Sequence, residues 1–407
     1  MAGRSMLSRV AARVTSLFAP LFSPVVAALV GALGLAACAN ADARNGSQEL
    51  RVWAFGAEGE AIAPMIRDFE RANPGVHVRA QQIPWTAAHE KLLTAFVGDA
   101  LPDVAQLGNT WIPEFAALGA LAALDSDFAR DSAHTPRADY FPGVLATNVV
   151  DDTLFGVPWY VDTRVLFYRS DLLRLAGVPA APTTWQQWRD ALTRLKHVQA
   201  PGSFPILLPL DEWAQPVILA LQCGAPLLAD HGTRGFFRDP RFRRGFEFYV
   251  DLFRDSLAPP IANTQISNVY QEFAAGRLAM WITGPWNVGE FRKRLPDSLE
   301  GTLATAPLPG PDGPGVSLAG GSSLVVMRKT HHRDAAWRFI AFLSDPARQA
   351  SFYDATGDLP GRRSAWATPK LANDPQLAAF REQLGRVVPM PAVPEWELIA
   401  TDIAAAG

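Results

Sequence analysis

The chain has 407 residues, with 37 lysines and arginines against 40 acidic residues, and 49% of its residues are hydrophobic. This length allows roughly two to three domain-sized units with substantial cores. A formal net charge of -3 gives no electrostatic reason to expect a nucleic-acid partner. The 23 phenylalanines and 12 tryptophans exclude a disordered chain, and two cysteines exclude a disulfide-rich scaffold or a four-cysteine zinc site.

Residues 1–37 are predicted to be an export signal. Its first part contains Arg4, Arg9 and Arg13 and no acidic residue, and an apolar stretch follows from about Leu17 to Ala37. The Leu-Ala-Ala-Cys motif that ends at Cys38 resembles the lipobox of bacterial lipoproteins, in which the cysteine is lipidated and becomes the mature N-terminus. We therefore expect lipidation at Cys38 and a polar tether over 38–47. An ordinary signal cleaved near Ala37 and a retained membrane anchor are the alternatives.

The remaining cysteine and the rest of the sequence fit a tethered body outside the cytoplasm. If Cys38 carries lipid, Cys223 is the free thiol, and we expect it to be a buried small apolar side chain. No later segment reaches the roughly 18 uninterrupted apolar residues that a membrane-spanning helix needs.

The segment that follows the tether predicts strands and helices in alternation. The expected elements are a strand over 50–54, a helix over 60–72, a strand over 76–80, a helix over 86–97 and a strand over 102–107. This order is typical of a parallel sheet with crossover helices. Ligands of such sheets gather outside the carboxyl ends of the strands, and Glu58 and Asn109 each follow a predicted strand closely.

A second α/β pattern begins after Asp162. The expected elements are strands over 165–168, 206–208, 278–283 and 324–327, and helices from Thr184 and over 242–253 and 334–343. Thr183 or Thr184 is the expected N-cap of the first of these helices. Closely spaced prolines and glycines predict a loop over 307–315.

The motifs of common enzyme classes are incomplete in this sequence. It contains neither the phosphate-binding glycine loop nor the dinucleotide-binding one. His89-Glu90 begins like a zinc-protease motif, but Leu93 stands where a second histidine is required. We therefore expect no catalytic residue, no metal and no cofactor. A glycosidase with two distant carboxylates would leave no local signature, so this alternative stays open.

Aromatic residues that stand beside polar ones suggest a site for sugars. Sugars present CH faces that stack on aromatic rings and hydroxyls that pair with Asp, Glu, Asn and Arg. Three places fit this description: Trp159-Tyr160 with Asp162, Trp286 with Asn287, and Arg362-Arg363. Other tryptophans lie on predicted helix faces and are expected to pack in the core: Trp185, Trp188 and Trp337.

Five segments form an ordered pattern along the mature chain. They are Val52–Gly56 with Glu58, Phe69–Val76, Val157–Thr163, Phe273–Met280 leading to Gly284-Pro285-Trp286, and Gly320–Ser322. In this order and spacing they resemble the extracellular solute-binding proteins that deliver sugars to ABC importers, the family of the maltose- and trehalose-binding proteins. The resemblance covers essentially the whole mature chain.

The resemblance implies an α/β, two-lobed periplasmic-binding-protein fold whose hinge the chain crosses three times. By analogy, lobe one is 48–160 plus 303–345, and lobe two is 161–302 plus 346–407. The sugar would lie in the cleft between the lobes, and the membrane permease would recognise the closed form.

The resemblance also implies which residues bind the ligand. The expected contacts from lobe one are Glu58, Asn109, Gly320 and Gly321. Tyr160 and Asp162 would contact the sugar at the hinge. Trp286 would stack on it from lobe two, and Arg363 would reach it from the far side. Two departures from the family pattern leave the exact sugar open. Ser322 stands where many disaccharide binders have an aromatic residue, and Asn109 stands where the family often has Asp.

Together these features predict a periplasmic, lipid-anchored sugar-binding component of an ABC importer, without enzymatic activity. A disaccharide such as maltose or trehalose is the expected ligand, and the permease is the expected partner. The membrane would be contacted through the lipid alone, no nucleic acid is expected, and the protein would be a monomer. The alternatives are an extracytoplasmic glycoside hydrolase, or the same fold binding a polyol or another polar solute.

Overall fold

The computed structural model describes residues 47–406, so the predicted signal, Cys38 and most of the tether lie outside the described residues. The chain divides into two units. The described part of the smaller unit is 47–49 and 74–77, in which the backbone N–H of Gln48 donates to the carbonyl of Gly75 at 2.7 Å. The larger unit holds the other described residues and contains every site discussed below.

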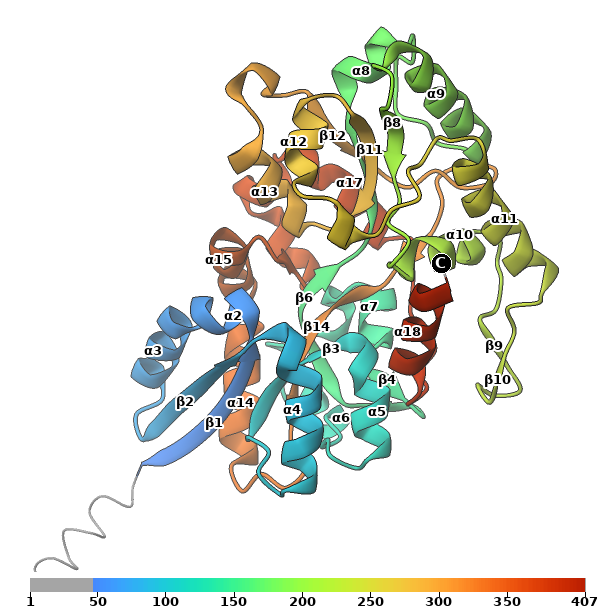
Figure 1. The fold of residues 1–407 in the computed structure, drawn as a ribbon. Helices are drawn as coiled ribbons and strands as arrows, with labels where there is room; N and C mark the ends of the chain where they lie inside the picture. The colour runs from blue at the N-terminus through green and yellow to red at the C-terminus, as the bar shows by residue number, and fades with distance from the viewer. Residues whose placement is uncertain (1–46, 407) are drawn as a thin grey trace, which may run out of the picture. The chain divides into compact units, whose positions relative to one another are not determined.

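A mixed six-stranded sheet contains the first predicted strands (Figure 1). Its order is β15-β6-β14-β3-β1-β2, with β1 parallel to β3 and β14 antiparallel to both β3 and β6. The strands are β1 (Gln48–Phe55), β2 (Val76–Ile83), β3 (Val104–Gly108), β6 (Gly156–Asp162), β14 (Gly320–Val326) and β15 (Leu359–Pro360). The predicted alternation of strands and helices over residues 48–108 is therefore confirmed, as is a parallel β1–β3 pair.

Two elements of this region differ from the prediction. The helix expected over 60–72 is two helices, α2 (Gly56–Ala61) and α3 (Ala63–Ala72). Pro64 lies in the first turn of α3, where its missing N–H costs nothing, so it favours a new helix start. Strand β14 begins at Gly320, four residues before the predicted strand. Gly320 and Gly321 pair with Asp162 and Val161 of β6, and this pairing holds them in an extended conformation that glycine does not favour by itself.

A second sheet of four strands has the order β12-β7-β11-β8. The strands are β7 (Val165–Arg169), β8 (Phe204–Leu207), β11 (Leu278–Thr283) and β12 (Leu303–Ala306). Strand β12 pairs antiparallel with β7 in this sheet, although the expected boundaries placed residue 303 onward with the first lobe. Nothing in the four residues of β12 distinguishes one sheet from the other, since strand pairing is decided by tertiary contacts.

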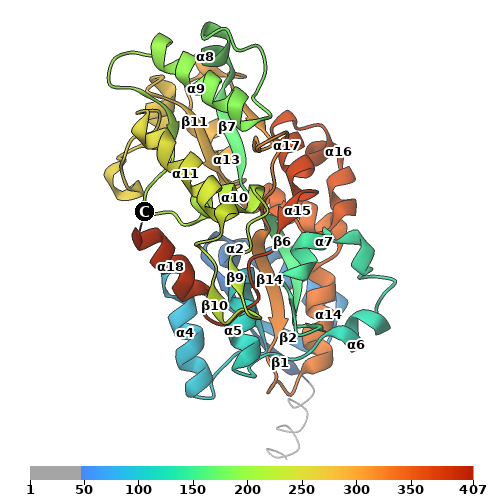
Figure 2. The ribbon, with the colours of Figure 1, turned by 90° about the vertical axis from the view of Figure 1, so that its right-hand side faces the viewer.

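The chain passes between the two sheets several times. It leaves the six-stranded sheet after β6, pairs β7 into the four-stranded sheet, and returns between β12 and β14. After β15 it passes over again, because α17 (Pro375–Leu384) packs on β12 and β7. Figures 1 and 2 show the two sheets one above the other, with β6 and β14 running toward the four-stranded sheet.

Helices surround both sheets and bury large apolar side chains. In addition to α2, α3 and α17 they are α4 (Trp85–Val97), α5 (Ile112–Ala117), α6 (Asp125–Arg130), α7 (Pro142–Ala146), α8 (Ser170–Leu175), α9 (Trp185–Val198), α10 (Ala214–Gln222), α11 (Pro240–Arg254), α12 (Val269–Ala274), α13 (Trp286–Arg294), α14 (Arg333–Leu343), α15 (Pro346–Thr356), α16 (Pro369–Ala372) and α18 (Trp396–Ala406). Thr184 caps α9 in a capping box with Gln187, which decides between the two predicted caps.

Short elements complete the fold. They are the strand pairs β4 (Val149–Val150) with β5 (Thr153–Leu154), β9 (Leu228–Ala229) with β10 (Arg234–Gly235) and β13 (Ser317–Leu318) with β16 (Val387–Val388), and the 3-10 helices η1 (Asn109–Trp111), η2 (Arg137–Asp139), η3 (Asn263–Gln265), η4 (Asp297–Leu299) and η5 (Arg363–Ala367). Within residues 47–406 no helix has the length and apolar character needed to cross a membrane.

The predicted core tryptophans are buried, whereas the free cysteine is less buried than expected. Trp185, Trp188 and Trp337 all lie in the core. Cys223 is only partly buried at the end of α10, where it packs against the core cluster of the four-stranded sheet. Burial raises the pKa of its thiol, so the reactive thiolate is disfavoured.

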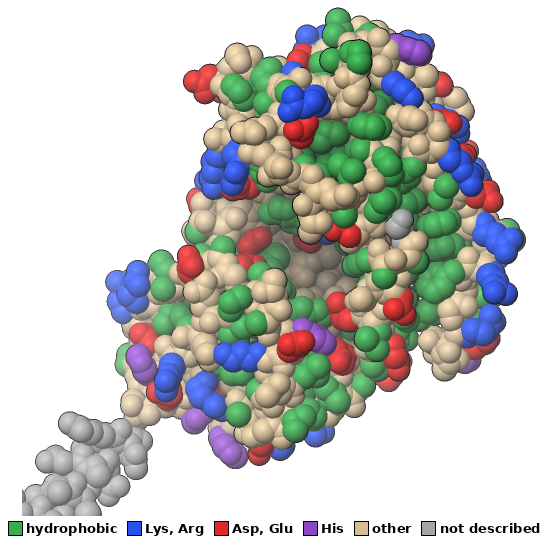
Figure 3. Space-filling view, viewed as in Figure 1, with side chains coloured by type: hydrophobic (Ala, Val, Ile, Leu, Met, Phe, Trp, Pro, Cys, Tyr) green, Lys and Arg blue, Asp and Glu red, His purple; other side chains and the backbone are tan. Residues whose placement is uncertain are grey.

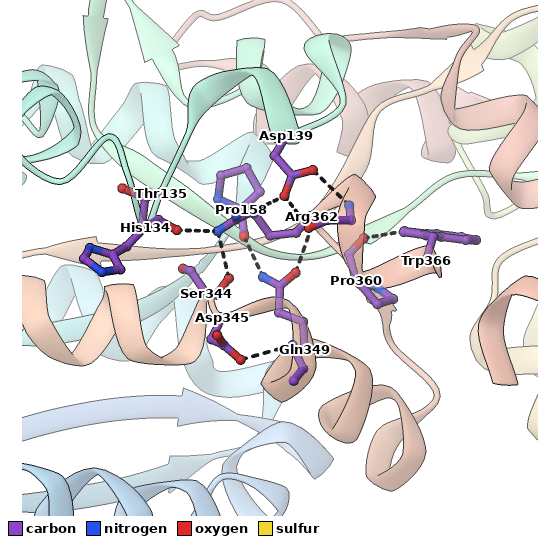
Figure 4. A network of polar contacts seen from close by, with 12 residues as sticks. His134, Thr135, Asp139, Pro158, Ser344, Asp345, Gln349, Pro360, Arg362 and Trp366 are labelled. Atoms are coloured by element: carbon purple, nitrogen blue, oxygen red, sulfur yellow. Dashed lines mark hydrogen bonds and ion pairs between the residues drawn. The ribbon is translucent and has the colours of Figure 1, made fainter. Parts of the chain in front are cut away.

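Arg362 fastens β15 to its surroundings (Figure 4). Its Nε donates to Asp139 at 2.6 Å, and its Nη1 donates to the carbonyls of His134 and Ser344 at 2.9 and 3.2 Å. Gln349 accepts from the backbone N–H of Arg362 at 2.8 Å and donates to the carbonyl of Pro158 in β6 at 3.4 Å. Burial raises the pKa of Asp139, but hydrogen bonds from Ser364 and Arg362 outweigh it and hold that pKa below its usual value. Arg362, which the sequence offered as a sugar contact, is therefore a buried structural residue.

Gly321 allows β14 to approach β6 more closely than any other residue would. Its φ of +127° lies in the region that L side chains rarely adopt. A Cβ at this position would overlap the carbonyl oxygen of Tyr160 and lie 2.9 Å from Val161 Cα. The pairing of β14 with the end of β6 therefore depends on the missing side chain.

Gly321→Ala is expected to lower the free energy of unfolding by at least about 3 kcal/mol, because it adds backbone strain and an overlap with β6. Gly357→Ala is the matched control: its φ is +82°, but a Cβ there meets nothing within 4 Å, so only strain of about 1 kcal/mol is expected. Urea denaturation of both variants measures the difference. Equal losses would show that contact with β6 is unimportant at Gly321.

Candidate functional site

Glu58 lies in the first turn of α2, directly after β1, and is 6% exposed. Tyr160 in β6 donates its hydroxyl to Glu58 Oε1 at 2.7 Å. Trp85 Nε1 donates to the two carboxylate oxygens at 3.2 and 3.4 Å, and Gln106 Nε2 donates to Oε1 at 3.4 Å. Three donors from three different elements therefore hold this carboxylate, as a buried charge requires.

A buried hydrogen bond joins Tyr160 to Glu58, and both are expected site residues. Its phenol has a pKa well above the usual value, first because it is buried and second because the charge of Glu58 opposes its ionisation. The hydroxyl therefore remains a donor to Glu58 over the whole physiological range. Gln106 also donates to this hydroxyl, at 3.3 Å.

Asp162 ends β6 and lies beside Gly320 in the neighbouring strand. A Cβ on Gly320 would lie 3.1 Å from Asp162 Cγ, so the glycine keeps the space next to the carboxylate open. Arg164 donates from Nη1 to Asp162 Oδ1. Burial raises the pKa of Asp162, and the pairing with Arg164 offsets part of that rise.

Trp286 is the first residue of α13, and 43% of its surface is exposed. A Cβ on Gly284 would overlap the six-membered ring of Trp286, so the glycine lets the indole lie against the backbone. The Arg164 guanidinium carbon lies 4.6 Å from the centre of the indole ring. The side chain of Arg164 thus connects Asp162 with Trp286.

The side-chain nitrogen of Asn109, the first residue of η1, bonds to two neighbours within the protein. Its amide nitrogen donates to the carbonyl of Ala319 at 3.1 Å and to Thr147 Oγ1 at 3.3 Å. Ser322 is also buried, and its hydroxyl donates to the carbonyl of Leu107 at 2.8 Å. These two residues are the departures from the family pattern. Ser322 joins β14 to β3, and Asn109, directly after β3, joins that end of the strand to Ala319, the residue before β14.

Neither Arg363 nor Trp159 forms a side-chain hydrogen bond to Glu58, Tyr160 or Asp162 in the described part of the chain. Arg363 begins η5, is exposed, and forms no side-chain hydrogen bond or ion pair with another described residue. Trp159 is buried and stacks on Phe352 with ring centres 4.5 Å apart. Trp159 is therefore a core residue, although the sequence offered it as one of the exposed aromatics.

Asp358 lies next to these residues. Leu359 pairs with Val161 and Pro360 pairs with Tyr160, so the same antiparallel register places Asp358 beside Asp162. Burial and the nearby charge of Glu58 raise the pKa of Asp358 to about 7, and Asp162 adds to the rise. Figure 3 shows that this face of the molecule is hollowed at the level of β6 and β14, with acidic side chains on the walls of the hollow.

Sequence reasoning missed four residues of this arrangement: Trp85, Gln106, Arg164 and Asp358. Trp85 follows a proline at a helix start, and Asp358 belongs to the segment Gly357–Arg363, which fits the family pattern. These two positions carried a signal that could have been used. Gln106 and Arg164 are ordinary polar residues in the sequence, and only strand pairing shows what they face.

No group of three or more His, Cys, Asp or Glu side chains in the described part of the chain could hold a metal ion. The hydrogen-bonded carboxylates of this site face tyrosine, tryptophan, glutamine and arginine donors instead. Such a set suits hydrogen bonding to a polar ligand.

Comparison with known proteins identifies the class. Residues 55–350 match the model of the family described as bacterial extracellular solute-binding protein, and this chain belongs to that family. The proteins of the family are transport receptors and not enzymes.

Solved and curated relatives agree with this assignment. The sugar-binding protein MalE from the phytopathogen Xanthomonas citri is 50% identical, with a TM-score of 0.86 and coverage of 88% of this chain and 90% of that one. The diacetylchitobiose binding protein DasA of Streptomyces coelicolor is 26% identical over 370 residues, which are 89% of this chain and 84% of that protein. An uncharacterised lipoprotein of Streptomyces antibioticus is 27% identical over 395 residues, with 89% and 83% covered. The expected α/β periplasmic-binding-protein fold is confirmed.

Tyr160→Phe is expected to lower the free energy of unfolding by about 1.5–3 kcal/mol, because it removes a buried hydrogen bond to a carboxylate. Tyr168→Phe is the control, since Tyr168 is partly buried in β7 and its hydroxyl bonds to no other described residue. Chemical denaturation at pH 7 measures both. A loss for Tyr160→Phe no larger than for the control would mean that the Glu58 contact contributes nothing to stability.

Proposed function

We propose that this protein is the sugar-binding component of an ABC importer, and that it binds a disaccharide such as maltose or trehalose beside Glu58, Asp162 and Trp286. The observation that carries the proposal is the combination of hydrogen-bonded carboxylates with a tryptophan ring that is 43% exposed. Carboxylates accept from sugar hydroxyls, and an exposed indole can cover the CH face of a pyranose.

The relatives support a sugar as the solute class. The 50%-identical relative is named a sugar-binding protein, and a more distant one is named a diacetylchitobiose binding protein. Polar groups around Glu58 and an exposed ring at Trp286 support a solute that offers both hydroxyls and a CH face. Maltose and trehalose remain the specific candidates.

The fold supports a closing motion of two lobes about the crossings between the sheets. We assign 48–160 with most of 303–345 to lobe one and 161–302 with most of 346–407 to lobe two. Strand pairing moves β12 to lobe two, because it pairs with β7, and β15 to lobe one, because it pairs with β6. Tyr160 and Asp162 lie at the end of β6, where the chain passes from one sheet to the other. A ligand that contacts both lobes favours the closed form, which the permease would recognise. The receptor would act as a monomer, with Asn109, Gly320, Gly321 and Arg363 as further ligand contacts.

The hydrolase alternative has no support in the family match, since that family consists of solute receptors. A polyol or another polar solute in the same site is a possible result of a binding screen, and it would keep the fold and change only the ligand.

A ligand screen by thermal unfolding tests the proposal. Maltose or trehalose at 100 times its dissociation constant should stabilise the protein by about 2.7 kcal/mol. Trp286→Ala should weaken binding of that sugar at least about tenfold, because stacking and burial of the ring are lost. Phe246→Ala, which removes a ring of α11 that is 38% exposed, should leave affinity unchanged.

Calorimetry then separates the outcomes. Sugar binding that is unaffected by Trp286→Ala would contradict the placement of the site. A wild-type protein that binds neither disaccharide but responds to polyols would contradict the sugar assignment and leave the family intact.

We further propose that the mature protein is anchored to a membrane of the cell envelope by lipid on Cys38. The motif before Cys38 supports this, as does a relative described as a lipoprotein. Cys38→Ser is expected to release the protein into the soluble fraction, because the thioether is the attachment point. Cys223→Ser, the control, should leave the protein with the membranes. Retention of Cys38→Ser on membranes after salt washing would contradict lipid anchoring.

A further inference from the structure

Three carboxyl groups meet at the end of β6. Asp162 lies at the end of the strand, Asp358 lies beside it across the β15–β6 pair, and Glu58 bonds to Tyr160 two residues earlier in β6. Arg164 is the one cation that pairs with any of them in the described part of the chain. The side-chain hydrogen bonds that the Glu58 carboxylate accepts come from neutral donors.

The segment that carries Asp358 is held firmly. Thr356 Oγ1 accepts from the backbone N–H of Asp358 at 3.1 Å. On the other side, Arg362 is fastened to Asp139 and to two carbonyls, and Gly361 lies so close to β6 that a Cβ there would be 2.8 Å from the carbonyl oxygen of Pro158. Asp358 therefore cannot move away from Asp162 without breaking these contacts.

We propose that Asp358 is a further ligand-binding residue, which faces the solute as a neutral carboxylic acid and donates a hydrogen bond to one of its oxygens. This inference rests on the proposed function and adds a donor to a site whose other carboxyl groups accept. Three ionised carboxylates beside one guanidinium would repel one another. Their electrostatic free energy is therefore lower when one of the three carboxyl groups is neutral.

The charged groups that face Asp358 agree on this assignment. Burial raises the pKa of Asp358 most, and the charge of Glu58, which approaches from α2, raises it next. The hydroxyl of Thr356 lowers that pKa by less than Glu58 raises it, and the charge of Asp162, from β6, adds the smallest rise. A neutral ligand brings no positive charge and excludes water from the carboxyl groups. It therefore raises the pKa of Asp358 further and keeps the proton in place.

The proposal predicts that sugar affinity falls as pH rises. Protonated Asp358 is the binding form, so the dissociation constant for maltose or trehalose should increase about fivefold or more between pH 5.5 and pH 8.5. Asp358→Asn supplies an N–H donor without a titratable proton, so it should bind within about threefold of the wild type at pH 5.5 and show no such pH dependence. Asp358→Leu should bind at least about tenfold more weakly at pH 5.5.

Asp354→Asn is the matched control, because it removes one carboxylate from the exposed surface of α15, where Asp354 pairs with Lys370. It should keep the wild-type pH profile. The unliganded protein gives a second measurement. With a folded pKa near 7 and an unfolded value near 4, the wild type loses stability relative to Asp358→Asn as pH rises from about 4 to 7, and the difference in Tm stays constant above pH 7.

Isothermal titration with maltose and trehalose distinguishes the outcomes. A tenfold loss for Asp358→Asn at pH 5.5 would show that the anion is needed, and would overturn the proposal. Unchanged binding by Asp358→Leu, or a wild-type pH profile in Asp358→Asn, would overturn it as well. If the wild type binds neither sugar at any pH, the proposed function fails first and this inference fails with it.

Discussion

The close approach of β14 to β6 at Gly321 is the constraint on which the site depends. A side chain at this position would overlap the carbonyl oxygen of Tyr160, so only glycine allows the two strands to pair up to their ends. That pairing puts Gly320 beside Asp162 and brings β3, with Gln106, to the other side of β14. Tyr160 can then reach Glu58 from β6. Glu58, Gln106 and Tyr160, from three segments far apart in the sequence, share one hydrogen-bonded cluster.

Electrostatics then determines what each carboxyl group can do. Glu58 receives three neutral donors, Asp162 receives a guanidinium, and Asp358 has the hydroxyl of Thr356 but no paired cation within residues 47–406. Desolvation raises the pKa of both Asp162 and Asp358, so the different partners of the two aspartates decide how they differ. One chemical group in three surroundings thereby supplies two acceptors and a donor, a pattern suited to ligands whose hydroxyls both donate and accept.

Local sequence patterns predicted much of the fold. They also predicted those site residues that stand directly after a strand. Apolar periodicity placed the helix over 86–97 and the strands over 50–54 and 278–283, and the position of Glu58 after a strand followed from the same pattern. What could not be predicted depends on pairing between distant segments. The early start of β14, the sheet that β12 joins and the position of Asp358 opposite Asp162 are decided by partners more than 100 residues away.

The polar and aromatic groups of the site already have partners inside the protein, and this limits what a solute can gain. Arg164 lies on the Trp286 ring and donates to Asp162, so a sugar that uses either group must share or replace this guanidinium. The net free energy of such an exchange is the difference between two similar sets of contacts, and is therefore small for each group. Selectivity must come from the contacts that a solute makes together, which favours a ligand long enough to reach Trp286 and the carboxyl groups at the same time.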